Sequence, residues 1–254
     1  MSESNQPVIL VCNDDGIFSP GIRALAEVAD EFGKAEIIAP DRQQSAVGHA
    51  ITMNTPLRSR SFQINGRFNG QAVTGTPADS VKLGHDQLMK RKPDLVVSGI
   101  NHGSNAGINI LYSGTVSAAT EGTILGYPSI AISCTDYEEE ADLSGAKEAA
   151  RKVIGYVLHE GLPKGVTLNL NVPSGKLKGI KWARQANSRY VEEFEGRVDP
   201  NNRSYYWMTG KLKLLDEGED LDINVLEKGY ASLTPIQYDM TAYTLLKEVE
   251  DVEL

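Results

Sequence analysis

Short apolar runs alternate with amphipathic stretches along the first two thirds of the chain. Strands are predicted at residues 8–12, 36–39, 95–99, 129–133 and 167–171, which are short runs rich in Val, Ile, Leu and Ala. Helix starts are predicted at Ser19-Pro20, Thr76-Pro77 and Ser113, because hydroxyl side chains favour the N-cap and proline favours the first turn. Gly33 is expected to end the first helix. Apolar residues from 146 to 157 recur at helical spacing. This alternation predicts an α/β fold with a mostly parallel sheet, flanking helices and right-handed crossovers.

Two stretches and the tail depart from this alternation. Residues 51–73 are rich in β-formers, and Asn65-Gly66 is a hairpin-turn signal. Residues 180–215 carry Tyr, Phe and Trp on both sides of a polar turn at 199–202, which predicts a long aromatic hairpin. A short helix (222–228), a strand (231–233) and an amphipathic helix (241–249) follow. We therefore predict a catalytic core at 1–180 and an arm with a terminal helix at 181–254. The arm and helix either cover a partner or pack on the chain's own core.

Composition and charge narrow the class of protein. The chain has 254 residues, 41% of them hydrophobic, which is enough to bury a core without disulfides or a structural metal. A net charge of −9 argues against a general nucleic-acid binder, so we expect no nucleic-acid partner. Two cysteines, no signal peptide and no long apolar segment predict a cytoplasmic location without a membrane anchor.

Polar segments follow three of the predicted strands. Asn13-Asp14-Asp15-Gly16 follows the first, residues 39–46 follow the second, and residues 101–105 follow the third. Ligands of an open parallel sheet bind beyond the carboxyl ends of its strands. We therefore expect these segments, although distant in sequence, to meet at one edge of the sheet.

The adjacent carboxylates Asp14 and Asp15 are candidate metal ligands, because a cation between them relieves their repulsion. Ser45 and Asn101 are neutral oxygen donors that would complete a metal shell or bind a phosphate oxygen. A set made only of oxygens favours a hard divalent ion such as Mg²⁺ or Mn²⁺. The alternatives stay open: the Asp pair would cap the next helix in a solvated turn, and Ser45 and Asn101 would make ordinary loop hydrogen bonds.

A second group of residues has the chemistry of an anion site. Ser113, Gly114 and Thr115 open a helix whose N–H groups would bind phosphate. His102 and His49 lie in loops on the same side, where a histidine would donate to phosphate or act as a general acid. Otherwise both are loop histidines with satisfied hydrogen bonds.

The order of motifs resembles one known family. The chain reads NDDG, APDRQQSAVGHAIT, GTPADSV, SGINHGSNAG and YSGTVSAATEG in turn, then NLNVP and GYASLTP. In this order and spacing it is similar to the SurE survival-protein family of metal-dependent 5′- and 3′-nucleotidases. The resemblance implies a Rossmann-like core whose C-terminal part is exchanged in a homodimer, with homotetramers in some members. It also implies hydrolysis of nucleoside monophosphates, with polyphosphate as a side substrate.

The resemblance transfers roles to particular residues. The family's single divalent cation per subunit would be held by Asp14, Asp15, Ser45 and Asn101, whereas Asn13, Ser113, Gly114 and Thr115 fall in or beside its phosphate region. Either an activated water or Asp15 itself would attack phosphorus. His102 is the candidate that protonates the leaving nucleoside.

Three rival readings fit less well. A phosphatase with an aspartate nucleophile would need Asp-x-Asp after the first strand, where this chain has Asp14-Asp15. A dinucleotide oxidoreductase would need Gly-x-Gly-x-x-Gly at the same place, which this chain lacks. A nucleotide-binding signalling module without hydrolytic activity would have little use for two unneutralised carboxylates. Base preference, 5′ against 3′ preference, the metal and the oligomeric state stay open.

Overall fold

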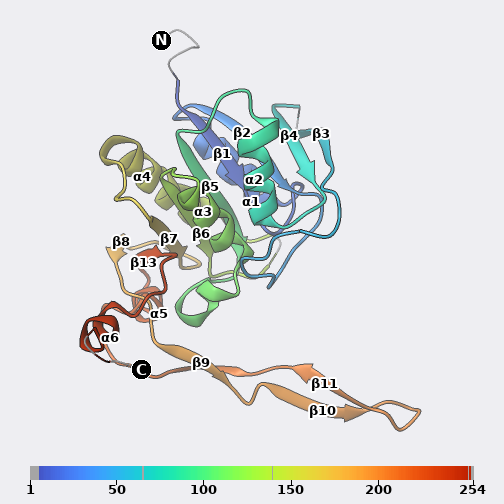
Figure 1. Cartoon of the computed structure of the whole chain (residues 1–254), viewed down its shortest axis with the longest axis vertical. Helices are drawn as coiled ribbons and strands as arrows, with labels where there is room; N and C mark the ends of the chain where they lie inside the picture. Colours follow the sequence, from blue (N-terminus) through green and yellow to red (C-terminus); the bar gives the residue numbers. More distant parts are fainter. Residues whose placement is uncertain (1–5, 65, 139, 251, 253–254) are drawn as a thin grey trace.

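The computed structural model describes residues 6–64, 66–138, 140–250 and 252. Its core strands are β1 (Val8–Cys12), β2 (Lys34–Pro40), β3 (Ser59–Ile64), β4 (Phe68–Val73), β5 (Leu95–His102), β6 (Ser129–Cys134), β7 (Val166–Val172), β8 (Ile180–Trp182) and β13 (Ala231–Gln237). They form one sheet in the order β3-β4-β2-β1-β5-β6-β7-β13-β8 (Figure 1). Only the pairs β3–β4 and β7–β13 are antiparallel, so the predicted α/β fold with a mostly parallel sheet is confirmed.

Helices cover both faces of this sheet. The helices are α1 (Pro20–Ala29), α2 (Pro77–Leu83), α3 (Gly114–Ile124), α4 (Ser144–Glu160), α5 (Asp222–Glu227) and α6 (Tyr243–Glu248), with a π-helical turn η2 (Gly84–Leu88) and a 3-10 helix η3 (Gly107–Leu111). Of these, α6 has no buried residue and does not cover the sheet. The three predicted N-caps are confirmed: Ser19, Thr76 and Ser113 each accept a hydrogen bond from the first turn. The predicted stop at Gly33 is wrong, because α1 already ends at Ala29. Gly33 instead lets the entry to β2 pass Pro7, whose carbonyl oxygen would lie 2.2 Å from an added Cβ.

One crossover has an unexpected hand. Helix α4 lies beside α1, where Lys147 contacts Glu27 at 2.6 Å, whereas α3 lies beside α2 on the other face. The connection β6-α4-β7 therefore has the opposite hand to those through α1, α2 and α3, and the expectation of right-handed crossovers throughout is wrong. The cause lies in β7: Leu168 and Leu170 pack in the core with the apolar face of α4, whereas the alternate positions of β7 are polar. An apolar strand face needs an apolar helix face to cover it.

The C-terminal part begins with the predicted hairpin. Strands β9 (Ser188–Val191) and β12 (Lys211–Leu214) pair antiparallel, as do β10 (Phe194–Val198) and β11 (Ser204–Met208). Figure 1 shows this arm projecting away from the sheet. The turn at 199–203 is closed by hydrogen bonds within the loop. The chain then returns to the core as β13, and every residue of α6 is exposed.

Two smaller expectations have mixed outcomes. In the β-rich stretch 51–73 only residues from Ser59 onward form strands, and Asn65 of the predicted turn lies outside the described residues. Within the described ranges, no helix combines the length and the apolarity that crossing a membrane requires. The cytoplasmic location stays a prediction.

Candidate active site

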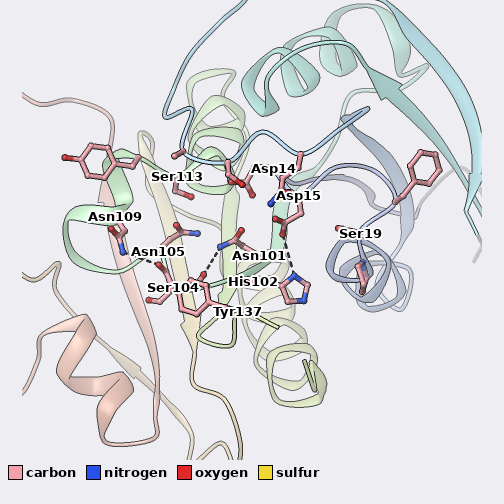
Figure 2. A pocket seen from close by; sticks show the side chains of 17 residues that line it. Asp14, Asp15, Ser19, Asn101, His102, Ser104, Asn105, Asn109, Ser113 and Tyr137 are labelled. Atoms are coloured by element: carbon pink, nitrogen blue, oxygen red, sulfur yellow. Dashed lines mark hydrogen bonds and ion pairs between the residues drawn. The ribbon is translucent and has the colours of Figure 1, made fainter. Parts of the chain in front are cut away.

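A cavity opens where the sheet changes direction. The chain leaves β1 for β2 on one side, while β5 pairs with β1 on the other, so their carboxyl ends flank a crevice. The cavity has a volume of about 710 Å³ (Figure 2). It is lined by Asp14, Asp15, Phe18, Ser19, Pro20, Gln43, Ser45, Ala46, Asn101, His102, Gly103, Ser104, Asn105, Asn109, Tyr112, Ser113 and Tyr137. The structure thus brings together the segments after β1, β2 and β5.

Six of the predicted site residues line this cavity, namely Asp14, Asp15, Ser45, Asn101, His102 and Ser113. Asn13, Gly114 and Thr115 lie behind the cavity wall. Asn13 is fully buried, and its amide donates to the Gly16 carbonyl (3.1 Å) and to the Ser19 hydroxyl (2.8 Å). Asn13 therefore ties the turn that carries the two aspartates to the start of α1.

The first turn of α3 packs directly on Asp14. The Thr115 hydroxyl donates to Asp14 Oδ1. A Cβ added at Gly114 would lie 2.7 Å from Asp14 Cβ and 3.0 Å from Asp14 Oδ2, so this close approach requires glycine. The start of α3 thus packs on the Asp14 carboxylate and donates a hydrogen bond to it.

Burial opposes the charges of the aspartate pair. Asp14 is 6% exposed. Desolvation raises the pKa of Asp14 to about 6; hydrogen bonds from Thr115 lower it, and the neighbouring charge of Asp15 raises it. Desolvation also raises the pKa of Asp15, although the nearby His102 counteracts it. A cation bound between the two carboxylates would reverse both penalties.

Several buried polar atoms at the site have no hydrogen-bond partner among the described residues. They include Asn13 Oδ1, Asp15 Oδ2 and His102 Nε2. His102 Nδ1 lies 3.7 Å from Asp15 Oδ2, beyond hydrogen-bond distance. Buried polar atoms are normally paired, so these orphans point to a missing ligand.

The donor set fits a hard divalent cation. Asp14 and Asp15 supply carboxylate oxygens, and Ser45 and Asn101 line the same cavity. Asn101 Nδ2 donates to the Gly103 carbonyl at 2.7 Å, which turns its Oδ1 away from that bond and leaves it to accept. No cluster of three or more His, Cys, Asp or Glu side chains occurs in the part of the chain that the structure describes. A metal here would therefore depend on the neutral oxygens of Ser45 and Asn101.

A strand irregularity positions Asn101. The register between β5 and β6 shifts between Ser98 and Asn101. Gly99 has φ +136°, and a Cβ there would lie 2.1 Å from the Ile132 carbonyl oxygen. Such a bulge redirects the side chains that follow it, here Asn101 and His102 at the crevice.

The loop after β2 is held over the cavity at several points. Gln44 N donates to the Asp14 carbonyl (2.7 Å), and Gly48 N donates to the Tyr112 carbonyl (3.0 Å). His49 Nε2 lies 2.9 Å from Glu121 Oε2 and does not line the cavity. Of the two alternatives for His49, the satisfied loop histidine is therefore the one the structure shows.

Some residues that line or support the cavity were not among those predicted from the sequence. Tyr137 follows β6, and the rule applied to the other strands would have found it. Asn169 and Asn171 of β7 are buried and hydrogen-bond the backbone of Asn105. Their signal was amide residues alternating with leucine inside a strand. Asn109, between two isoleucines of η3, gave no such signal.

Comparison with known proteins agrees with this geometry. Residues 9–192 match the family model described as "Survival protein SurE". The chain is 47% identical to "5'-nucleotidase SurE" of Christiangramia forsetii, covering 98% of each chain, and 49% identical to the same-named protein of Cytophaga hutchinsonii, covering 96% of each. A crystal structure of the SurE protein from Aquifex aeolicus superposes with a TM-score of 0.83 at 41% identity, covering 96% of this chain and 98% of that one. With its core matched by the family model and its full length matched by these relatives, the chain belongs to the SurE family of survival proteins.

Proposed function

We propose that this chain is a divalent-metal-dependent phosphomonoesterase that releases phosphate from nucleoside 5′-monophosphates. The observation that carries the proposal is the buried aspartate pair just beyond the carboxyl end of β1, with unpaired buried oxygens and an open cavity beside it. The relatives named 5'-nucleotidase SurE support the same activity. We extend the proposal to 3′-monophosphates and polyphosphate because the resemblance to the SurE family implies both.

Asp14, Asp15, Ser45 and Asn101 would hold one cation per subunit, Mg²⁺ or Mn²⁺. When bound, such an ion neutralises phosphate charge and makes phosphorus more electrophilic. Asp14 is held rigidly for this task, because Thr115 and Gly114 of α3 enclose it. Asn101 is fixed by its bond to Gly103.

The remaining residues orient substrate and move protons. Ser113 lines the cavity, although its hydroxyl already accepts from Val116 N at 3.0 Å. His102 has an unpaired Nε2 and is the candidate proton donor to the leaving nucleoside. Attack by water and attack by the Asp15 carboxylate are both compatible with this arrangement. A nucleotide-binding module without hydrolysis is disfavoured, because two bare carboxylates repel phosphate.

We also propose that residues 181–254 mediate assembly into a homodimer or homotetramer. The arm exposes large apolar side chains that no described residue of this chain covers, among them Phe194, Tyr206, Trp207 and Met208. Helix α6 exposes Tyr243, Leu245 and Leu246. Exposed apolar surface of this extent marks an interaction site.

Phosphate release tests the activity. We would assay a panel of nucleoside 5′- and 3′-monophosphates and p-nitrophenyl phosphate with EDTA, Mg²⁺ or Mn²⁺. We expect release only with metal, and a loss of at least about a hundredfold in Asp14→Asn, because a metal ligand is removed. Asp41→Asn, an exposed carboxylate in the neighbouring loop, is the matched control and should retain activity. Metal-independent release, or an unchanged rate in Asp14→Asn, would contradict the proposal.

A further inference from the structure

The cavity has one wall that the phosphate chemistry does not use. In Figure 2, Asn109 and Asn105 lie across the cavity from His102 and Ser19, with Asp14 and Asp15 between them. Asn109 belongs to η3, and Tyr112, which lines the same wall, follows directly after that helix. A nucleotide whose phosphate sits at the aspartates must place its nucleoside toward one of the two remaining ends.

Asn109 is a polar side chain with bonding capacity left on this wall. Its Oδ1 accepts from the Tyr190 hydroxyl at 2.9 Å, and its Nδ2 donates to the Ser104 carbonyl at 3.4 Å. A carboxamide has two donor hydrogens and two acceptor lone pairs. One of each therefore remains, and together they match the mixed donors and acceptors of ribose hydroxyls and base edges.

Several other polar lining groups already make hydrogen bonds within the chain. The Ser19 hydroxyl caps α1 and accepts from Asn13. The Asn105 amide donates to the Ser133 hydroxyl at 2.8 Å, and its backbone is bonded to β7. Phe18 and Pro20, at the Ser19 end, offer only carbon surface. The end of the cavity with Asn109 and Asn105 thus offers more hydrogen-bonding groups than the end with Ser19.

The base of the arm fixes the position of this wall. Ile108 N donates to the Ser188 hydroxyl at 2.9 Å, and Gln185 Nε2 donates to the Gly107 carbonyl at 2.9 Å. Gly107 N donates to the buried Asp222, which also accepts from Ala186 N. Together with the Tyr190 bond, these contacts make η3 and residues 185–190 one structural unit.

We propose that Asn109 binds the nucleoside part of the substrate and that Tyr190, on the first strand of the arm, is the positioning residue for it. This inference rests on the proposed nucleotidase function and names the part of the site that recognises the leaving group. It also links the arm to substrate affinity, because Tyr190 of β9 holds Asn109 in the position where it would contact the nucleoside. Tyr112 adds an aromatic ring to the same wall, on which a base stacks.

The test separates the nucleoside from the phosphate. Asn109→Ala and Tyr190→Phe would be assayed with the best nucleoside monophosphate and with p-nitrophenyl phosphate, which lacks ribose and base. We expect KM for the nucleotide to rise roughly three- to tenfold in Asn109→Ala and about two- to fivefold in Tyr190→Phe, the range of one lost hydrogen bond. The kcat should stay unchanged, and so should both constants for p-nitrophenyl phosphate.

A second measurement uses the free nucleoside as a competitive inhibitor of p-nitrophenyl phosphate hydrolysis. Its inhibition constant should rise by the same factor as KM, because the nucleoside contacts only the Asn109 end. Tyr206→Phe, which removes a hydroxyl from an exposed position farther along the arm, is the matched control and should change neither constant. Unfolding midpoints of all variants would be compared to exclude misfolding.

The outcomes distinguish the two proposals. If the wild type hydrolyses both substrates but the variants leave the nucleoside inhibition constant unchanged, or lower kcat for p-nitrophenyl phosphate in parallel, the role of Asn109 and Tyr190 is overturned while the enzyme function stands. If the wild type releases no phosphate from either substrate with any metal, the enzyme function fails, and this inference fails with it.

Discussion

Asp14 is a carboxylate in surroundings that oppose its charge. It is buried, it adjoins a second carboxylate, and its strongest protein partner is a single threonine hydroxyl. Its pKa of about 6 means that, without a cation, the ionised form is destabilised in the folded state. The ionised Asp14 therefore lowers the stability of the folded protein, and a bound cation would remove this penalty.

Replacing this carboxylate by a neutral amide should stabilise the metal-free protein. The folded pKa of Asp14 is raised to about 6 from an ordinary 3.8, so the unfavourable contribution is full above about pH 6, shrinks as the pH falls and disappears below 3.8. We expect metal-free Asp14→Asn to exceed the wild type in free energy of unfolding at pH 7.5 by up to roughly 3 kcal/mol, and this difference should vanish below about pH 3. Urea unfolding in EDTA measures this.

The same experiment with metal should reverse the order. A saturating divalent cation stabilises only a protein that binds it, so the wild type should gain stability and Asp14→Asn should not. Asp41→Asn again serves as the exposed control. A metal-free Asp14→Asn that is less stable than the wild type at pH 7.5 would show that Asp14 contributes a favourable charge interaction, contrary to this account.

Between elements, a buried glutamate holds the loop that carries Ser45. Glu121 of α3 is 3% exposed and accepts from Lys82 Nζ of α2 at 2.8 Å, while its other oxygen lies 2.9 Å from His49 Nε2. Burial raises the pKa of Glu121, but the hydrogen bonds from His49 and Lys82 outweigh it and hold the pKa below its usual range. Helices α2 and α3 and the loop after β2 meet at this one side chain.

Glu121→Gln should loosen this junction. We expect a loss of about 1–3 kcal/mol in the free energy of unfolding at pH 7, since the charge that Lys82 and His49 contact is removed. Metal affinity should fall about three- to tenfold, because Ser45 is less firmly held. Because the folded pKa is lowered, the stability difference should be full above pH 4.5 and shrink as the pH falls further.

Isothermal titration with Mn²⁺ and urea unfolding would measure these effects. Glu148→Gln is the matched control, since Glu148 pairs with Lys152 on the exposed face of α4 and surface pairs contribute little. Equal effects in both variants would mean that Glu121 has no special part in holding the loop.

At the scale of the molecule, large apolar side chains of the arm are left exposed by the described part of the chain. Figure 1 shows it extending beyond the core, and Trp207 (57% exposed) and Phe194 (62%) lie on its paired strands. A two-stranded ribbon with apolar side chains is only marginally stable in water. The proposed assembly would bury these residues.

A charge on the arm should weaken that assembly. We expect Trp207→Glu to shift the protein toward monomer in light scattering coupled to size exclusion, because a buried, unpaired carboxylate is costly in an interface. Met53→Glu introduces the same charge at an exposed apolar side chain outside the arm and should leave the oligomeric state unchanged. A wild type that is monomeric at all concentrations would refute the assembly proposal.

Much of the secondary structure and the place of the site could be predicted from the sequence. The strands, the three helix caps and the aromatic hairpin follow from apolar runs, hydroxyl caps and turn residues, which act within a few positions of the chain. The meeting of Asp14, Asp15, Ser45 and Asn101 also followed, because in a parallel sheet the residues after each strand share one edge. Their role as metal ligands stays a prediction.

Only the tertiary structure decided the rest. The hand of the α4 crossover depends on which face of β7 is apolar once the sheet has formed, and the bond from Thr115 to Asp14 joins residues 101 positions apart. Likewise, the side chain of Asn109 is positioned by a hydrogen bond from Tyr190, which lies 81 positions away on the arm. Sequence patterns report a residue's own tendencies, whereas these contacts exist only where packing brings distant segments together.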